Sequence, residues 1–383
     1  MKKVIAATAA FMMVAGVASV ATAAVDLSGN ARVRMIYTDN MFLEDDSETH
    51  LDSRVRINVV AKSVGGAFAK ARIRMMDQDG SYLGGSGDSW GMADNSTARS
   101  DDRNIYVDYA WLGIPLGNGM TIEGGYMTVN WSPFFVFDQR KDRLKLTYKA
   151  SKTLTLGATF DKLNEGDLDA ASDEDQNNWG ILAKNKFANG MNGALRIVYH
   201  ADDRAVDQSG MRGSVSLAGK VGEGKLYGEL VYVDKDIAAN GLGAGAADDR
   251  MGGYLSWNGA LGGMNPELML GYTKDGYQAD NDFGWIMIGK AEPITAIARV
   301  GSGGDTTFAS ISNTFKLSEK SNLTGNLVYM DVDAENQDAL EVSARYAYAV
   351  SDGASISLSA GYLDTDRYVN NPMAAYVSLD VTY

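Results

Sequence analysis

Basic side chains recur at every second position in several short segments of this sequence. Residues at this spacing share one face of an extended chain, because successive side chains of a strand point to opposite sides. Guanidinium and ammonium groups bind carboxylates and other anions. Cations packed this closely repel one another in a dry interior, so they need water and counter-charge. The residues are Arg32, Arg34, Arg54, Arg56, Lys70, Arg72, Arg74, Arg143, Lys145 and Lys149.

The two histidines, His50 and His200, are the side chains best suited to acid–base chemistry. Asp202 and Asp203 follow His200 closely, and an imidazole beside a carboxylate can serve as a general base. A base must also be oriented and reach a substrate, which proximity in sequence does not establish. We expect no catalytic residue and no enzyme. Cysteine is absent, and the acidic run Asp173–Asp175 lacks the ligand order and glycine of a calcium loop, so we expect no metal and no cofactor.

The first residues and the charge balance narrow the class of protein. Lys2 and Lys3 precede an apolar run from Val4 to Val20, and small residues follow at positions 21–24. This order predicts a secretory signal peptide over residues 1–24 and a mature chain of residues 25–383. A membrane-spanning helix would need about 20 apolar residues and different flanks. Without the two lysines, 33 Lys and Arg stand against 49 Asp and Glu. This acidic balance argues against a nucleic-acid partner.

Apolar and polar residues alternate along segments of about ten residues from one end of the mature chain to the other. In one such segment Leu154, Leu156 and Phe160 share a face, and Thr155 and Thr159 lie opposite. Period-two alternation predicts a strand with one apolar and one polar side. Residues 195–200 and 225–232 repeat the pattern.

Short turns and long polar stretches alternate between these segments. The short turns are 62–66, 151–152, 189–192, 221–224, 317–321 and 351–353, and the long stretches are 40–49, 80–102, 163–177, 235–249 and 332–338. Short turns on one rim and long loops on the other predict an all-β fold, a closed antiparallel transmembrane β-barrel of the outer membrane. A direct tally gives 20 strands. The count is 18 if the apolar residues 283–288 and 294–298 do not form a hairpin.

Aromatic residues mark both ends of the predicted strands. Tyrosine favours the boundary between lipid headgroups and hydrocarbon, so aromatics at matched heights predict two girdles. A soluble sandwich would not need aromatics at both ends of its strands. One girdle comprises Tyr37, Tyr126, Phe160, Tyr199, Tyr232, Tyr272, Tyr329 and Tyr362, and the opposite one Phe187, Phe315, Tyr348 and Tyr383.

The last strand carries a recognisable pattern. Residues 373–383 end in Tyr383, with apolar residues at alternating positions before it. This resembles the β-signal of bacterial outer-membrane proteins, which implies recognition by the barrel-assembly machinery. The terminal strand must also pair with the first, because lipid cannot satisfy an open edge.

Residues 106–126 resemble a stretch of the general trimeric porins of Gram-negative bacteria. An aromatic-rich strand ends in a glycine-containing turn, and the next strand runs into the third loop. The usual glycine–arginine pair before that loop is here Gly125-Tyr126. The resemblance implies a homotrimer in the outer membrane that lets ions and small hydrophilic solutes diffuse passively. It also implies that the third loop, residues 129–141, folds inward as a constriction.

If the apolar faces meet lipid, the basic residues at alternate positions line a water-filled lumen. We expect the third loop to face this basic wall and to orient dipolar solutes; the alternative is packing at a subunit interface. The constriction candidates are Glu123, Asn130, Trp131, Phe134, Phe135, Phe137 and Asp138, with Asp108 beside them. The basic wall favours anions, whereas the acidic loops would attract cations at the mouth, so selectivity stays open. The alternative functions are a surface adhesin or receptor and, with less support, a hydrolase at the rim.

Overall fold

The computed structural model describes residues 24–40, 47–75, 105–164, 175–203, 208–237, 248–280, 283, 287, 300–301, 304–333, 338–366 and 370–383. These residues form one 18-stranded sheet. The strands are β1 (Ala24–Asp39), β2 (Ser47–Lys62), β3 (Phe68–Met75), β4 (Ile105–Gly117), β5 (Met120–Val129), β6 (Gln139–Lys149), β7 (Leu154–Asn164), β8 (Gln176–Lys186), β9 (Asn192–Asp202), β10 (Gly210–Val221), β11 (Gly224–Val233), β12 (Arg250–Gly259), β13 (Glu267–Lys274), β14 (Thr306–Lys316), β15 (Ser321–Val332), β16 (Ala339–Ser351), β17 (Ala354–Thr365) and β18 (Met373–Thr382). In the described part of the chain, no helix is long and apolar enough to cross a membrane.

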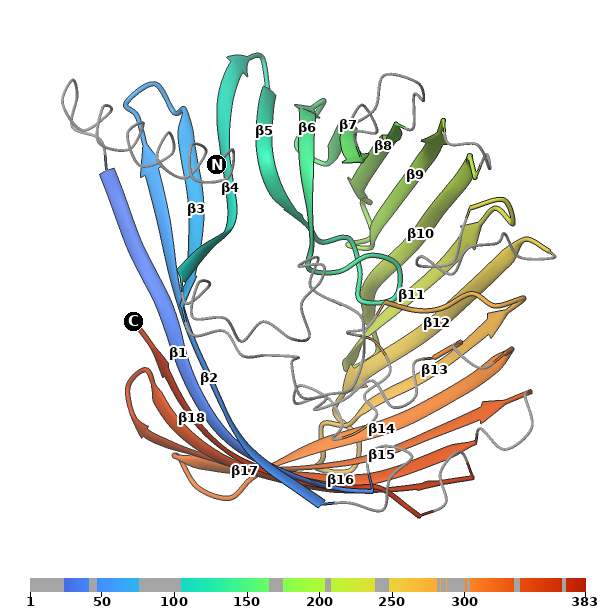
Figure 1. Cartoon of the computed structure of the whole chain (residues 1–383). Helices are drawn as coiled ribbons and strands as arrows, with labels where there is room; N and C mark the ends of the chain where they lie inside the picture. Colours follow the sequence, from blue (N-terminus) through green and yellow to red (C-terminus); the bar gives the residue numbers. More distant parts are fainter. Residues whose placement is uncertain are drawn as a thin grey trace.

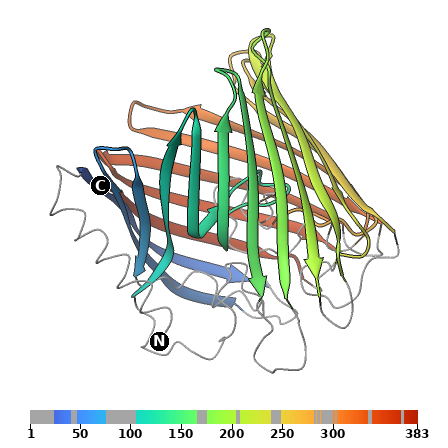
Figure 2. The same ribbon diagram turned by 90° about the horizontal axis from the view of Figure 1, so that it is seen from above.

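The sheet closes on itself as an antiparallel barrel. Each strand pairs with its neighbours in sequence, and β1 also pairs with β18, with Asn30 opposite Thr382 and Asp39 opposite Met373 (Figure 1). At the seam, Gly29 and Tyr383 exchange two backbone hydrogen bonds of 2.8 and 3.1 Å. Closure leaves no unpaired edge for lipid to meet. In Figure 2 the strands run side by side around the wall, and the short turns gather at one rim.

Local sequence explains the tight turns at this rim. The link between β4 and β5 is Asn118-Gly119, and both residues have positive φ, 49° and 78°. Two consecutive positive φ values define a type I′ turn, whose twist matches that of the flanking strands and which strongly prefers Asn-Gly. A Cβ at Gly119 would also approach the Lys149 carbonyl oxygen to 2.9 Å. Glycine is therefore required there by both conformation and space.

The two faces of each strand have opposite chemistry, as the alternation predicts. On β1, Val33, Met35 and Tyr37 are exposed on the outer surface, whereas Arg32 and Arg34 are buried inside. The outer surface presents leucine, valine and methionine to the bilayer, and the lumen receives the charged residues.

The strand count of 18 is confirmed and the direct tally of 20 is wrong. The error lies between β13 and β14, where the sequence predicts a hairpin from residues 283–288 and 294–298; of these, the structure describes Phe283 and Met287. Described residues of this connection, including Tyr277, Phe283, Met287 and Val300, are buried in a cluster with inward-facing side chains of the wall. Their apolar character therefore reflects packing inside the barrel rather than contact with lipid. Of the predicted signal peptide, residues 1–23 lie outside the described residues, and the long polar loops lie largely outside them.

Candidate pore and constriction

The predicted basic residues of β1, β2 and β3 share the inner face of the barrel. Arg32 lies directly opposite Arg54 in the register of β1 and β2, and Arg56 lies opposite Arg74 in that of β2 and β3. Directly opposed residues of neighbouring strands point to the same face. Arg32, Arg34, Arg54 and Arg74 are buried from bulk solvent by the surrounding wall. Lys70 and Arg72 complete the series on β3, with Arg72 over the ring of Tyr109 at 4.6 Å.

The buried carboxylate of Asp52 binds both arginines of β1. Asp52 of β2 accepts hydrogen bonds from Arg34 Nη2 at 2.6 Å and Nε at 3.0 Å, and from Arg32 Nη2 at 3.4 Å. Charge-assisted bonds of this kind fix the direction of a guanidinium. Two guanidinium groups therefore share the Asp52 carboxylate.

A second cluster lies where the third loop rejoins the wall. Asp108 of β4 accepts from Arg140 at 3.0 Å on each oxygen and contacts Arg72 and Arg74 of β3 at 3.2 and 3.1 Å. Arg140 also pairs with Asp138 at 2.9 Å. Three guanidinium groups therefore stand against two carboxylates, and the cluster joins β3, β4 and β6 to the base of the loop.

The basic residues of β6 have carboxylate partners on the flanking strands. Arg143 pairs with Asp161 of β7 at 2.5 and 2.7 Å, and Lys145 pairs with Glu123 of β5 at 2.7 Å. Lys149 is exposed at the short-turn end of the strand. Glu123 thus stands on the wall beside the loop rather than within it.

The loop between β5 and β6 lies inside the barrel (Figure 1). Phe134 is 0% exposed, and its ring lies 5.1 Å from Tyr254 of β12 and 4.7 Å from Phe283. The indole N–H of Trp131 donates to Ser214 Oγ of β10 at 3.1 Å, and Ser132 Oγ donates to Glu229 of β11 at 2.8 Å.

Side-chain exposure differs between the ends of the loop and its middle. Phe135 is buried and Phe137 is half-buried, whereas Asn130 is exposed. The side-chain oxygen of Asn130 accepts from the Asp138 backbone N–H at 2.6 Å, which joins the two ends of the loop. The loop therefore packs against the wall opposite β1–β3.

A second inward segment holds the loop from the other side. The Tyr277 hydroxyl donates to the Phe134 carbonyl at 2.6 Å, and the Asp280 carboxylate accepts from the Phe137 backbone N–H at 3.1 Å. Burial, followed by the nearby carboxylates of Glu229 and Asp280, raises the pKa of the Tyr277 phenol well above its usual range. The phenol therefore stays protonated and remains a donor to the loop. The described residues of the β13–β14 connection thus pack inside the lumen.

The predicted aromatic girdles lie on the outer surface. Several hydroxyls of the long-loop girdle bond to polar residues of that rim: Tyr232 donates to Asp249 at 2.9 Å and Tyr272 to Asp305 at 3.2 Å. The other members of this girdle face outward and are exposed or half-buried: Tyr37, Tyr126, Phe160, Tyr199, Tyr329 and Tyr362. Phe187, Phe315, Tyr348 and Tyr383 are exposed at the short-turn end. A tyrosine at such a position can keep its ring on the apolar surface while its hydroxyl bonds to polar groups of the rim.

Sequence reasoning missed several inward cations. Arg196 of β9 and Arg212 of β10 lie on the inner face, with Arg196 opposite Ser214 and Arg212 opposite Val198. The alternation of Leu195, Arg196 and Ile197 contains the signal for Arg196. The role of Tyr277 and Asp280 has no comparable signal, because contacts between two connections do not follow strand periodicity.

His200 contacts polar side chains of the barrel wall. His200 Nδ1 lies 2.9 Å from Asn178 Oδ1, and its Nε2 is 4.0 Å from Asp202, which also accepts from Gln176 at 3.1 Å. These groups hold β8 and β9 together on the inner face. The side chain of His50 lies outside the described residues. In the residues that the structure describes, no group of three His, Cys, Asp or Glu could hold a metal ion.

Comparisons with known proteins agree with this architecture. Among solved structures, a BenF-like porin from Pseudomonas fluorescens Pf-5 is 11% identical, with a TM-score of 0.61 over 94% of this chain and 98% of that one. The outer membrane protein OpdK of Pseudomonas aeruginosa is 12% identical, with a TM-score of 0.59 over 94% and 99%. OccAB4 of Acinetobacter baumannii is 12% identical, with a TM-score of 0.58 over 94% and 98%.

At such identities these structures show a shared fold. No curated protein matches the sequence. The family model described as Gram-negative porin, in contrast, matches residues 6–368, nearly the whole chain. The chain therefore belongs to the Gram-negative porins, the channels through which small solutes cross the outer membrane.

Proposed function

We propose that ions and small hydrophilic solutes diffuse passively between the basic wall of β1–β3 and β6 and the inward loop of residues 129–141, with a preference for anions. The observation that carries this proposal is the excess of guanidinium groups over carboxylates among the paired residues of two clusters of the wall. Asp52 is shared by two arginines, and three arginines share Asp108 and Asp138. A lumen with this excess concentrates anions by its electrostatic field.

The placement of the loop supports a narrow point at this level. Its apolar side packs on the wall of β11–β14 through Phe134, while its base carries Asp138 beside Arg140. Fixed charges of both signs near one level orient dipolar solutes as they pass. The catalytic alternative has no comparable support, because His200 is bonded within the wall.

Selectivity measured in planar bilayers tests this proposal. Replacing Arg54, Arg56, Arg72 and Arg74 together by glutamate should move the reversal potential in a salt gradient toward that of a cation-selective channel. The matched control replaces Lys220, Lys225, Lys316 and Lys320, four exposed lysines near the short turns, by glutamate. The control has the same change in total charge and should shift the potential far less. Equal shifts in the two variants would mean that the arginines do not face the conduction path.

We further propose that the chain forms a homotrimer. We also propose that the barrel-assembly machinery recognises its C-terminal strand. These proposals rest on the pattern of residues 373–383 and on the resemblance of residues 106–126 to trimeric porins. Channels that open in groups of three in single-insertion recordings would support the trimer. Single conductance steps from particles of monomer mass would contradict it.

A further inference from the structure

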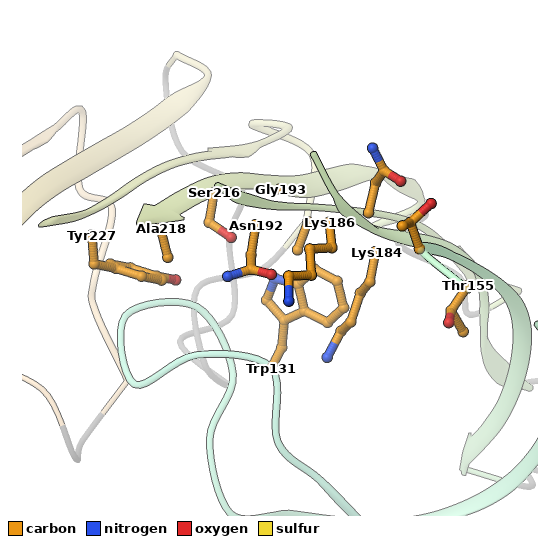
Figure 3. A pocket seen from close by; sticks show the side chains of 12 residues that line it. Trp131, Thr155, Lys184, Lys186, Asn192, Gly193, Ser216, Ala218 and Tyr227 are labelled. Atoms are coloured by element: carbon orange, nitrogen blue, oxygen red, sulfur yellow. The ribbon is translucent and has the colours of Figure 1, made fainter. Parts of the chain in front are cut away.

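A pocket of about 350 Å³ lies in the lumen on the short-turn side of the inward loop. Its residues come from the short-turn ends of β7–β11, and Trp131 of the loop covers it (Figure 3). A solute that has passed the loop would therefore meet this pocket before it leaves the barrel. The volume is within the range of about 300–1,000 Å³ that is usual for small-molecule sites.

Strand register explains why the wall is hollow here. One cross-strand row runs through Thr155, Lys184, Ala194 and Ser216, and the next through Lys186, Asn192, Ala218 and Tyr227. In the first row the small Ala194 and Ser216 lie beside Lys184, and in the second the small Ala218 lies between Asn192 and Tyr227. The small residues leave the depth of the pocket, and the lysines and the tyrosine form its sides.

The charge of the pocket has one sign. Of the 12 residues that line it, two are lysines and none is an acid. Figure 3 shows Lys184 and Lys186 extending from the sheet toward Trp131, and the Lys184 ammonium lies 5.0 Å from the centre of the indole ring. No ion pair joins either lysine to a carboxylate within the described ranges of the chain. A bound anion would supply that partner.

The other residues of the pocket favour a solute with more groups than a simple anion has. Neutral hydrogen-bonding side chains surround the lysines: Thr153, Thr155, Asn192 and Ser216. The indole of Trp131 is already fixed by its bond to Ser214, so the pocket has a preorganised apolar face. Hydroxyls and amides bind solute hydroxyl groups, and an indole face packs against the C–H face of a sugar ring.

From these contacts we infer that the pocket is a binding site for a carboxylated sugar, such as a uronic acid. The carboxylate lies between Lys184 and Lys186, the ring packs on Trp131, and the hydroxyls bond to the threonine, serine and asparagine side chains. This inference rests on the proposed diffusion function and names a solute class for it. An inorganic anion would use only the lysines, a neutral sugar would leave the lysines unpaired, and an aromatic carboxylate would leave the polar rows unused.

Current fluctuations in planar bilayers with potassium chloride test the inference, with glucuronate as the probe. Glucuronate should cause resolvable interruptions of the current, more frequently when added from the short-turn side. Glucose, benzoate and sulfate at equal concentration should interrupt the current much less. Equal effects of glucose, of benzoate or of sulfate would each overturn the assignment to a sugar acid.

Substitutions in the pocket test whether glucuronate binds there. Lys184→Gln, Lys186→Gln and Trp131→Leu should each weaken glucuronate binding about tenfold, the loss expected for one charge-assisted contact or one packed ring. Lys316→Gln and Trp179→Leu remove an exposed lysine and an exposed outward tryptophan and should bind as the wild type does. Unchanged binding in the pocket variants would overturn the site. Steady chloride currents without interruption by glucuronate would overturn this inference alone, and absence of any current would overturn the diffusion function as well.

Discussion

Three arginines of the wall converge on Asp108. Its carboxylate is 6% exposed and contacts Arg72, Arg74 and Arg140, which come from two strands. This side chain thus offsets part of the positive charge of the wall and ties the base of the inward loop to it. The same carboxylate therefore affects both selectivity and stability.

Asp108→Asn should raise the preference for chloride over potassium, because three guanidinium groups lose the charge that they share. It should also cost about 3 kcal/mol of stability, the lower end of the range for breaking a buried ion pair, because the lumen is hydrated. Reversal potentials and the temperature at which the folded band is lost on gels measure the two effects. Asp352→Asn removes an exposed carboxylate at the short-turn rim and should change neither. A shift toward cations would contradict the role given to Asp108.

At the scale of the element, the inward loop depends on its apolar side. Phe134 is fully buried among Tyr254, Tyr277 and Phe283, and the Tyr277 hydroxyl bonds to its carbonyl. The loop therefore occupies the lumen as a packed element rather than as a hydrated strand. The width of the passage depends on this packing.

Phe134→Ala should widen the passage, because removing a buried ring costs about 3–5 kcal/mol and releases the loop from the wall. Single-channel conductance should rise, and liposomes carrying the variant should swell in larger sugars that the wild type excludes. Phe315→Ala, which removes a ring of similar size from the outer surface, is the matched control and should conduct as the wild type does. Unchanged conductance of Phe134→Ala would mean that the loop does not set the width.

The sequence predicts the strands well and the inward connections less well. Alternation in residues such as 154–160 is a local signal with period two, so β7 and its neighbours follow directly from it. The same period places the basic residues of β1–β3 on one face. For the β13–β14 connection the sequence predicts a hairpin, because an apolar run does not distinguish a lipid-facing strand from a segment packed inside a lumen. The Tyr277–Phe134 contact joins positions far apart in the chain, and only the fold brings them together.

At the scale of the whole molecule, closure depends on the seam between β1 and β18. The terminal Tyr383 exchanges backbone bonds with Gly29, and its ring leaves no space for a Cβ at Gly29, which would lie 2.7 Å from the ring. The seam brings together the two ends of the described chain, so it is the pairing with the largest separation in sequence. Pairings of this kind form late, because the loop that they close is the longest.

Tyr383→Ser should lower the yield of folded barrel, measured as the fraction that migrates in the compact, heat-sensitive form on gels. The ring at the seam loses its contact with Gly29, and the last strand loses its terminal aromatic. Tyr348→Ser removes another exposed aromatic of the same rim and should fold with nearly wild-type yield. Equal losses in the two variants would point to a general need for interfacial aromatics instead of a need at the seam.

The contacts between the loop and the β13–β14 connection constrain the order in which the parts of the barrel fold. The Phe134 carbonyl accepts from the Tyr277 hydroxyl and the Asp280 backbone N–H, and all three groups lie inside a ring of 18 strands. Bulky aromatic segments cannot thread into a ring that has already closed around a packed interior. Both segments must therefore fold inward while the nascent sheet is still open, and the final pairing of β1 with β18 seals them in place.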